Sequence, residues 1–492
     1  MIKKVVFCLI SIVSIVSLSA TENVQNIYEE QSVITPIGNF PENDFQSEED
    51  YNSLNLSHNI FKPTIANHFT AIGEAQGSNI ILMGINRYIR KVSYAYISWD
   101  SIYKNLTNPW VWDQDEFWVN HLGHPYQGSF YYAAARSNNL PIWEAALITM
   151  SGSLAWELFA ETETPSYNDL IVTTIGGFTI GEMLHRLYFE AAGINKLLGF
   201  FISPMNSINN AMWKGKINRP DGNVTSLNTK LFFGALVDKI FFKESFVEGS
   251  PDFIPLYLGG GINIIYGDHF ENPSMTPFDQ FDLDVKFSFA KNYYNVSIFS
   301  DGMIFSFTPW DQDKLKTTVG MSLHYDFLYS NKTNYSANSI GFTAKQKVLL
   351  PKEWTIYWDA HLNYIMMSAS DFYFLFNDVI DPETQLENRI YDLGTGIGAK
   401  LSFNLSNPIF GNLNLFYFLD WVNTINSSVP QKGSPGSALI GIGSLNYDHK
   451  IYKTLSLGIE FSSYIKSAFY ENIEDTYEYD NYINIYLKNK FK

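Results

Sequence analysis

The residues best suited to chemistry lie in one block of the chain, between positions 112 and 186. Acids, histidines and arginines recur there inside apolar segments, where ionised side chains need partners. The polar set consists of Asp113, Asp115, Asn120, His124, Arg136, Glu157, Glu161, Ser166, Asp169, Glu182 and Arg186. Such residues can form ion pairs, hold a cation, or act as acid, base and nucleophile in hydrolysis.

Glu157 and Glu161 raise the sharpest question in this block. They are four residues apart in a segment with helical spacing, so two ionised carboxylates would repel on one helix face. The apolar neighbours strengthen that repulsion. We expect Arg136 and Arg186 to neutralise the pair, because guanidinium groups bind carboxylates in a bidentate manner. A bound ligand or metal is the second possibility.

Ser166 and Asp169 follow directly after a break at Pro165. A serine three residues before an acid, at the start of an apolar run, is typical of a helix N-cap. The same serine could instead be a nucleophile, with His124 and Asp169 as its partners. Spacing along the chain does not establish contact, so a hydrolase acting on lipid or envelope glycan stays open as the alternative.

A metal centre is the other chemistry that the block could support. Glu182-x-x-His185 is the spacing by which one helix offers two ligands to a di-metal carboxylate site. His121 and His124 could add imidazoles. The full pattern needs a second Glu-x-x-His, and the sequence has none. We therefore expect no resident metal and no other cofactor.

The order of the motifs is informative as a whole. The chain reads D-x-D-x-F-x-x-N, HPYQGS-x-YY-x-x-AR, S-x-x-WE-x-x-x-E, PS-x-x-D and G-x-x-x-GE-x-x-x-R. This series resembles an uncharacterised bacterial envelope family, domain of unknown function 3943, over about residues 85–200. The resemblance implies that the polar set, with Pro125, Gly128, Trp156 and Gly181, matches family positions, whereas His185 does not. The family has no known reaction, so its chemistry stays open.

The N-terminus predicts export. Lys3 and Lys4 precede a short apolar run and small residues, which is typical of a secretory signal peptide cleaved near Ala20. The only cysteine, Cys8, lies inside that signal (1–20). Without the two lysines the net charge falls from −17 to −19, which argues against a nucleic-acid partner. An acidic, disordered leader is expected over 21–57.

Two periodicities divide the rest of the chain. Residues 58–206 show helical spacing and include a Gly-x-x-x-Gly face at Gly177 and Gly181 that favours close helix approach. A linker is predicted at 207–227. Residues 228–492 alternate with period two, as in "FDLDVKFSF", "YDLGTGIGAKLSFN" and "KTLSLGIEFS". We count 12 strands, with the phase broken in 293–308, and expect His324 and His361 on the polar face.

The predicted fold class is α+β, with an N-terminal helical domain followed by an antiparallel transmembrane β-barrel of about 12 strands. In lipid, such a sheet must close to satisfy its backbone. We expect an outer-membrane location, with the leader and the helical domain on the periplasmic side. We hypothesise that the helices dock against or inside the periplasmic mouth of the barrel.

The favoured function is a non-enzymatic plugged pore or an envelope scaffold or binding protein. The expected partners are outer-membrane lipids and the barrel-assembly machinery, because Phe491 resembles the terminal aromatic sorting signal of outer-membrane barrels. The sequence does not identify a small-molecule or protein partner.

Overall fold

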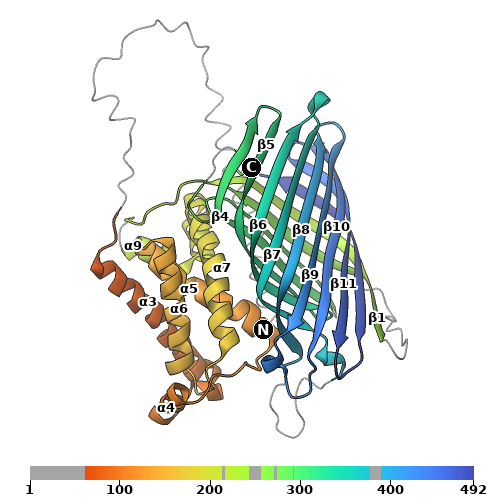
Figure 1. Cartoon of the computed structure of the whole chain (residues 1–492). Coiled ribbons are helices and arrows are strands. Elements are labelled where there is room, and N and C mark those ends of the chain that lie inside the picture. Colours follow the sequence, from red (N-terminus) through yellow and green to blue (C-terminus); the bar gives the residue numbers. More distant parts are fainter. Residues whose placement is uncertain are drawn as a thin grey trace, which may run out of the picture.

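A computed structural model describes residues 61–212, 216–242, 256–270, 274–291, 293–376 and 389–491. The predicted signal peptide and acidic leader lie outside the described residues. Figure 1 shows a group of helices standing beside a tall barrel of tilted strands.

Within the described residues the first domain has seven α-helices, and its helical nature is as predicted for this part of the chain. They are α3 (Ile65–Gly84), α4 (Trp99–Thr107), α5 (His124–Ser137), α6 (Ile142–Phe159), α7 (Tyr167–Ile194), α8 (Lys196–Ile202) and α9 (Pro204–Met212). Thr64 and Ser98 begin α3 and α4 with capping boxes, and Ser166 caps α7 by accepting the Asp169 N–H. No helix among the described residues combines the length and the apolar composition needed to cross a bilayer.

Twelve antiparallel strands form a closed barrel, which confirms the predicted number. They are β1 (Val224–Phe242), β2 (Leu256–Tyr266), β3 (Phe281–Ala290), β4 (Tyr293–Gln312), β5 (Leu315–Ser330), β6 (Asn334–Leu349), β7 (Thr355–Asp371), β8 (Tyr391–Asn407), β9 (Gly411–Thr424), β10 (Gly436–Tyr452), β11 (Leu455–Tyr470) and β12 (Thr476–Lys490). Each strand pairs with its sequence neighbours, and β12 closes the sheet on β1. Two register shifts in β4 account for the broken alternation within 293–308.

The two faces of the wall follow from the residues that line the internal cavity. Asp282, His324 and Lys400 border that cavity, so the residues next to them in each strand point outward. His361 borders it too, and the expectation that both histidines face the lumen is therefore confirmed. Many outward residues are exposed and apolar, as in Leu362 and Ile397. This is the alternation of a membrane barrel.

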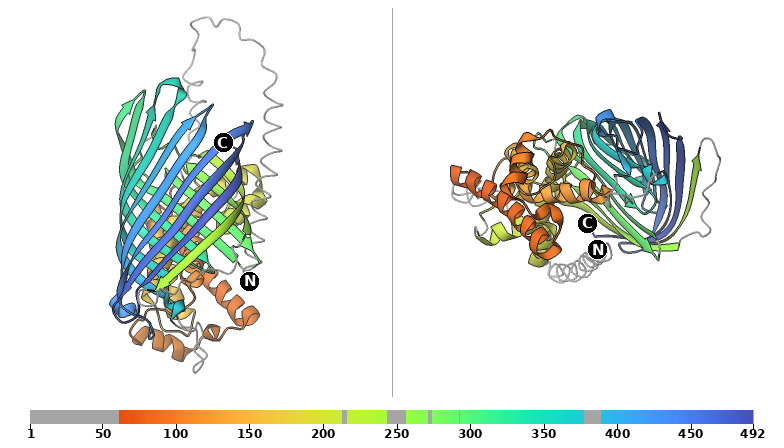
Figure 2. Two further views of the ribbon diagram at one scale, coloured as in Figure 1. Left: turned by 90° about the vertical axis from the view of Figure 1, so that its right-hand side faces the viewer. Right: turned by 90° about the horizontal axis from the view of Figure 1, so that it is seen from below.

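The helical domain packs on the outside of the barrel wall. Phe327 and Tyr391 point outward from β5 and β8, and both contact Phe117 of the helical domain. Seen along the barrel, the helices lie outside the ring of strands (Figure 2). The hypothesis that they dock against or inside the periplasmic mouth was therefore wrong. The outward face carries a patch of aromatic side chains that the helices cover.

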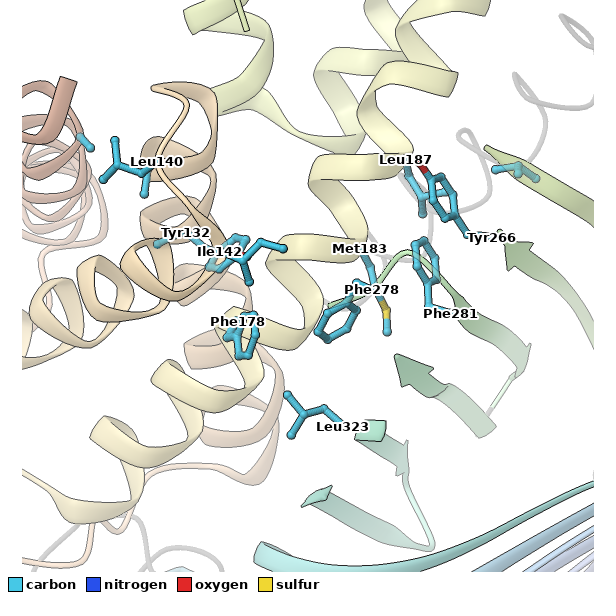
Figure 3. Close-up of a cluster of buried hydrophobic side chains, with 14 residues drawn as sticks. Tyr132, Leu140, Ile142, Phe178, Met183, Leu187, Tyr266, Phe278, Phe281 and Leu323 are labelled. Atoms are coloured by element: carbon cyan, nitrogen blue, oxygen red, sulfur yellow. The ribbon is translucent and has the colours of Figure 1, made fainter. Parts of the chain in front are cut away.

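A continuous apolar core joins the two parts. Figure 3 shows Phe178 and Met183 of α7 lying between Ile142 on one side and Phe278 and Phe281 of the barrel on the other. All these residues belong to one buried cluster. The helical domain is thus fixed to the wall by shared core packing.

The glycines of α7 let the helices approach closely, as the Gly-x-x-x-Gly spacing predicts. A Cβ on Gly177 would lie 2.6 Å from Gly128 Cα in α5, and one on Gly181 would lie 2.8 Å from Tyr132 Cβ. Only glycine leaves room for this contact. The crossing of α5 and α7 brings the polar set together in the middle of the domain.

Candidate functional site in the helical domain

The structure divides most of the predicted polar set into two clusters at different levels of α7. We name the first the ion-pair cluster (Arg136, Glu182 and Arg186). We name the second the acid cluster (Asp113, Asp115, Glu157, Glu161, Glu163 and Asp169, with His124 beside it). Their electrostatics are opposite, so we describe them in turn.

Glu182 is the centre of the ion-pair cluster. Its two carboxylate oxygens each lie 2.8 Å from an arginine Nε, that of Arg136 and that of Arg186, and Tyr132 donates a further hydrogen bond at 2.9 Å. Burial alone would raise the pKa of Glu182, but the two arginines outweigh it and hold this pKa at about 2. Arg186 also pairs with Asp279, 2.8 Å away on the barrel side.

The expectation that Arg136 and Arg186 neutralise Glu157 and Glu161 was therefore wrong. Both guanidinium groups bind the carboxylate of Glu182. Glu182 lies on α7, whereas Glu157 lies on α6. The arginine–acid pairs lock α5 to α7 and α7 to the barrel, which is a structural role.

Glu157 lies in the acid cluster and forms no ion pair with a lysine or arginine among the described residues; the basic group near it is the imidazole of His124. Its side chain is buried, and its Oε2 accepts a hydrogen bond from the Ser166 N–H at 2.8 Å. Burial raises the pKa of this carboxyl to about 8, and the charge of Asp169 acts in the same direction. At neutral pH the side chain therefore holds a proton.

Glu161 and Asp169 share this environment. Trp156 Nε1 donates to Glu161 at 3.0 Å, and the Ser166 hydroxyl donates to Asp169 at 2.5 Å. Burial raises the pKa of each acid well above its ordinary value, and a neighbouring carboxylate adds to the effect in both. Protonation and hydrogen bonding therefore relieve the repulsion that the spacing of Glu157 and Glu161 predicts.

The geometry around Ser166 does not support a hydrolase. Its hydroxyl is bound to Asp169, and its position at the start of α7 is that of a helix cap. His124 lies with Nε2 3.8 Å from Asp169 and Nδ1 3.3 Å from Thr173, so the imidazole does not activate the serine. Burial lowers the pKa of His124, which keeps the ring neutral. A nucleophile needs its base within hydrogen-bonding distance.

The outer rim of the acid cluster is more open. Asp113, Asp115 and Glu163 each place a carboxylate oxygen within 4.8 Å of the others. Asn120 donates to Asp113 at 2.8 Å. Glu163 was missed in the sequence, although it is only two residues from Pro165, where the chain turns back toward Asp113. Glu163 is exposed and the two aspartates are half-buried, and acids grouped in this way are common without a bound ion.

The residues weighed as metal ligands are not brought together. Glu182 is held by two arginines, and His185 Nδ1 lies 3.1 Å from Asn206 Oδ1. His121 stacks on Phe117 at the barrel wall, and burial lowers its pKa to about 3. No cofactor-binding constellation therefore forms from this set.

Three barrel residues complete the surroundings of the acid cluster. Tyr391 accepts a hydrogen bond from Asn120 at 2.8 Å and donates one to the Asp115 carbonyl at 3.0 Å. Arg389 donates to the Asp113 carbonyl at 3.1 Å, and the Tyr325 hydroxyl donates to the His121 carbonyl. In the sequence, outward aromatics such as Tyr391 have the same spacing as lipid-facing ones, so no signal distinguished them.

The barrel interior holds a second polar region. A cavity of about 1190 Å³ is lined by residues from strands all round the wall. Lysines of the lumen wall pair with acids on other strands, with Lys345 2.7 Å from Asp282 and Lys400 2.7 Å from Asp326. Toward the end at which β1 begins and β12 ends, the lining reaches the exposed turn residue Lys453.

Toward the other end the lumen is filled by packed side chains. This buried group, which we name the septum, includes Leu328, Tyr335, Phe372, Phe418, Ile440 and Tyr464. Tyr335 also donates a hydrogen bond to Asp420 across the lumen. Among the described residues, the cavity is thus a vestibule that ends on an apolar floor.

Comparison with known proteins identifies one segment of the chain. The family described as "Domain of unknown function (DUF3943)" matches residues 109–205, so the resemblance is confirmed but starts later than residue 85. No curated protein matches the chain.

The solved structures that resemble the chain are outer-membrane barrels. A mutant of the TodX monoaromatic hydrocarbon channel is 8% identical, with 56% of this chain and 91% of that one covered and a TM-score of 0.26. An outer-membrane channel from Pseudomonas putida F1 is 8% identical over 55% and 96%, with a TM-score of 0.29. The KdgM porin is 7% identical over 52% and 98%, with a TM-score of 0.20. Likeness this low carries no argument about function. Residues 109–205 therefore match the domain of unknown function 3943, and a closed twelve-stranded barrel follows them.

Proposed function

We propose that this chain is an outer-membrane protein whose barrel is a plugged pore, with no catalytic role for the helical domain. The closed sheet and its apolar outward face support a membrane location, because a barrel is the form in which strands satisfy their backbone in lipid. The start of β1, the end of β12 and most short turns lie at one end, which in such barrels faces the periplasm.

The observation that carries the proposal is the contrast within the lumen. The vestibule, at the end where β1 begins and β12 ends, is wide and lined by charged side chains, as suits passage of a polar solute. The septum below it is packed, with the buried acids Asp326 and Asp420 paired among its apolar side chains, so the path ends there. A constriction of this type blocks ions until its side chains move.

The charged side chains of the lumen wall are arranged as expected for a gated pore rather than for a solid core. Lys286 and Lys230 both reach Glu460, at 3.1 and 3.3 Å, around the vestibule. These pairs hold the wall in shape while leaving the cavity open above the septum.

The barrel-assembly machinery would insert such a barrel. Phe491 lies beside β1, where its N–H donates to the Leu227 carbonyl.

The placement of the helical domain is part of the same proposal. The packing of the helical domain on β5 and β8 does not support a domain that stands free on the periplasmic side. We assign it to the level of the wall, where it stabilises the barrel from outside. In this role the acid cluster and the ion-pair cluster fix the domain to the barrel.

The test is conductance of the purified full chain in planar bilayers. The wild type should give little current, and Phe418→Ala combined with Tyr464→Ala should raise it by removing two septum side chains. The matched control replaces Trp421 and Phe461, which point outward from the same two strands, and should leave the current unchanged.

Folding of each variant is checked by the shift in gel mobility on heating that folded barrels show. A folded septum variant that conducts no more than the wild type would overturn the proposal. A wild type that already conducts as an open pore would overturn it as well, because the septum would then not be a barrier.

A further inference from the structure

We infer that the helical domain lies in the outer membrane beside the barrel, with the outer faces of α3 and α6 in contact with lipid acyl chains. This inference rests on the proposed membrane location of the barrel and assigns a partner to a surface that the plugged-pore function leaves unexplained.

The first observation is that the domain buries polar side chains and exposes large apolar ones, the reverse of a protein surrounded by water. In proteins surrounded by water, large apolar side chains gather inside and charged ones outside. Here the buried side chains include acids, arginines and many amides, whereas the outer surface carries large apolar ones. The buried polar residues include Asn79, Asn86, Asn105, Asn120, Glu157, Asp169, Glu182, His185, Arg186, Asn206 and Asn209. Ionisable residues facing inward are the rule for helices in lipid.

The apolar surface follows the spacing of two helices. In α6, Trp143, Leu147, Met150 and Leu154 recur every three or four residues, so they form one stripe. Trp143 and Leu147 are 55% and 60% exposed. In α3 the exposed residues Ile65, Phe69, Ile72 and Ile80 form a second stripe. A contiguous apolar face of this size is unusual on a water-exposed protein.

The second observation is the continuity of this surface with the lipid-facing wall. The domain packs on Leu323, Tyr325 and Phe327, which point outward from β5. On β7 and β8 the uncovered outward residues Leu362 and Ile397 are apolar and exposed. The helices therefore occupy positions that lipid takes elsewhere around the barrel, and they present an apolar face in its place.

The dimensions agree with this placement. Figure 1 shows α6 and α7 running alongside the strands, within the height of the wall for much of their length. An α-helix rises about 1.5 Å per residue, so the 18 residues of α6 extend for roughly 27 Å. The hydrocarbon layer is about 30 Å thick. A domain fixed to the wall at this level meets acyl chains on its free side.

The experiment measures the surroundings of single labelled positions in the full chain. Cys8→Ser removes the only native cysteine, and Leu147→Cys or Phe69→Cys then carries a nitroxide spin label. The protein is reconstituted in vesicles of phosphatidylcholine and phosphatidylglycerol. Collision with oxygen, which concentrates in lipid, is compared with collision with a water-soluble nickel chelate.

Two control positions fix the scale. Leu362→Cys is on the bare wall and reports lipid, while Lys453→Cys is in a turn at the barrel edge and reports water. We expect labels at Leu147 and Phe69 to match that at Leu362, with a ratio of oxygen to nickel collisions several-fold above that at Lys453. All four positions are exposed, so the substitutions should not disturb folding.

Each other outcome has a definite meaning. Labels at Leu147 and Phe69 that behave like the one at Lys453 would show water on this face and refute lipid contact. Labels that neither reagent reaches would show that a second copy or another protein covers the face, which refutes it too. A label at Leu362 that reports water would instead overturn the proposed membrane location itself.

Discussion

Exchanging single acids for amides in the two clusters should give opposite results. Glu157→Gln removes a carboxyl that has no lysine or arginine partner among the described residues, and the glutamine oxygen can still accept the Ser166 N–H. Glu182→Gln removes the charge that two arginines share. The two side chains are equally well buried, so the comparison isolates their electrostatic surroundings.

The magnitude for Glu157 follows from its pKa. The carboxyl titrates near 4.5 when unfolded and at about 8 in the folded protein, a difference that corresponds to about 5 kcal/mol. Between these values the folded state holds a proton that the unfolded state has lost. The wild-type free energy of unfolding should therefore fall as the pH rises through this window. Glu157→Gln should match the wild type below pH 4.5 and exceed its stability by up to about 5 kcal/mol above pH 8.

Glu182→Gln should have the other sign. The folded-state pKa of Glu182 lies at about 2, so its ionised form stabilises the fold above pH 4.5 and is lost only in acid. Removing the charge leaves the buried guanidinium of Arg136 without its acid and that of Arg186 with Asp279 alone, which should destabilise the domain by about 3–5 kcal/mol at neutral pH.

Urea unfolding in detergent micelles measures both variants. The helical signal in circular dichroism follows the domain, and gel mobility with and without heating follows the barrel. Equal losses of stability in the two variants at neutral pH would refute the reasoning. So would a wild-type stability that rises between pH 4.5 and 8, because a bound cation would then be neutralising Glu157.

Three further outcomes follow from single contacts. Gly177→Ala puts a Cβ 2.6 Å from Gly128 Cα and should lower stability by about 1–3 kcal/mol in the same unfolding assay. Tyr391→Phe removes two hydrogen bonds to the helical domain, and limited proteolysis should then cut the helices faster while the barrel stays intact. Lys400→Met leaves Asp326 unpaired in the lumen and should lower the temperature at which the barrel loses its folded gel mobility, whereas combining it with Asp326→Asn should restore much of the loss.

The sequence was sufficient for those parts of the fold that depend on local spacing. Alternation predicted twelve strands, and the cap at Ser166 and the glycines of α7 were found because each depends on residues a few positions apart. The irregular part of β4 was visible too, as a broken phase that the structure explains by two register shifts.

Partner choice and placement could not be predicted in this way. Arg136 pairs with Glu182 because α5 crosses α7 at Gly177, and that crossing point is a property of the packed domain. Only the pair of Glu182 with Arg186, four residues apart on α7, follows from spacing. Likewise, Tyr391 shows the outward phase of any lipid-facing residue. Whether lipid or a helix covers such a residue depends on shape complementarity, which spacing along a single strand does not encode.

The docking of the helices on the outer wall has a consequence for biogenesis. The helices precede the barrel in the chain, yet their docking surface is built from β5 and β8 and exists only after much of the sheet has formed. Until those strands have paired, Phe117 and the other apolar residues of the helical domain that pack on them have no partner, and apolar surface left uncovered in this way favours aggregation. We therefore expect the domain that is made first to dock last.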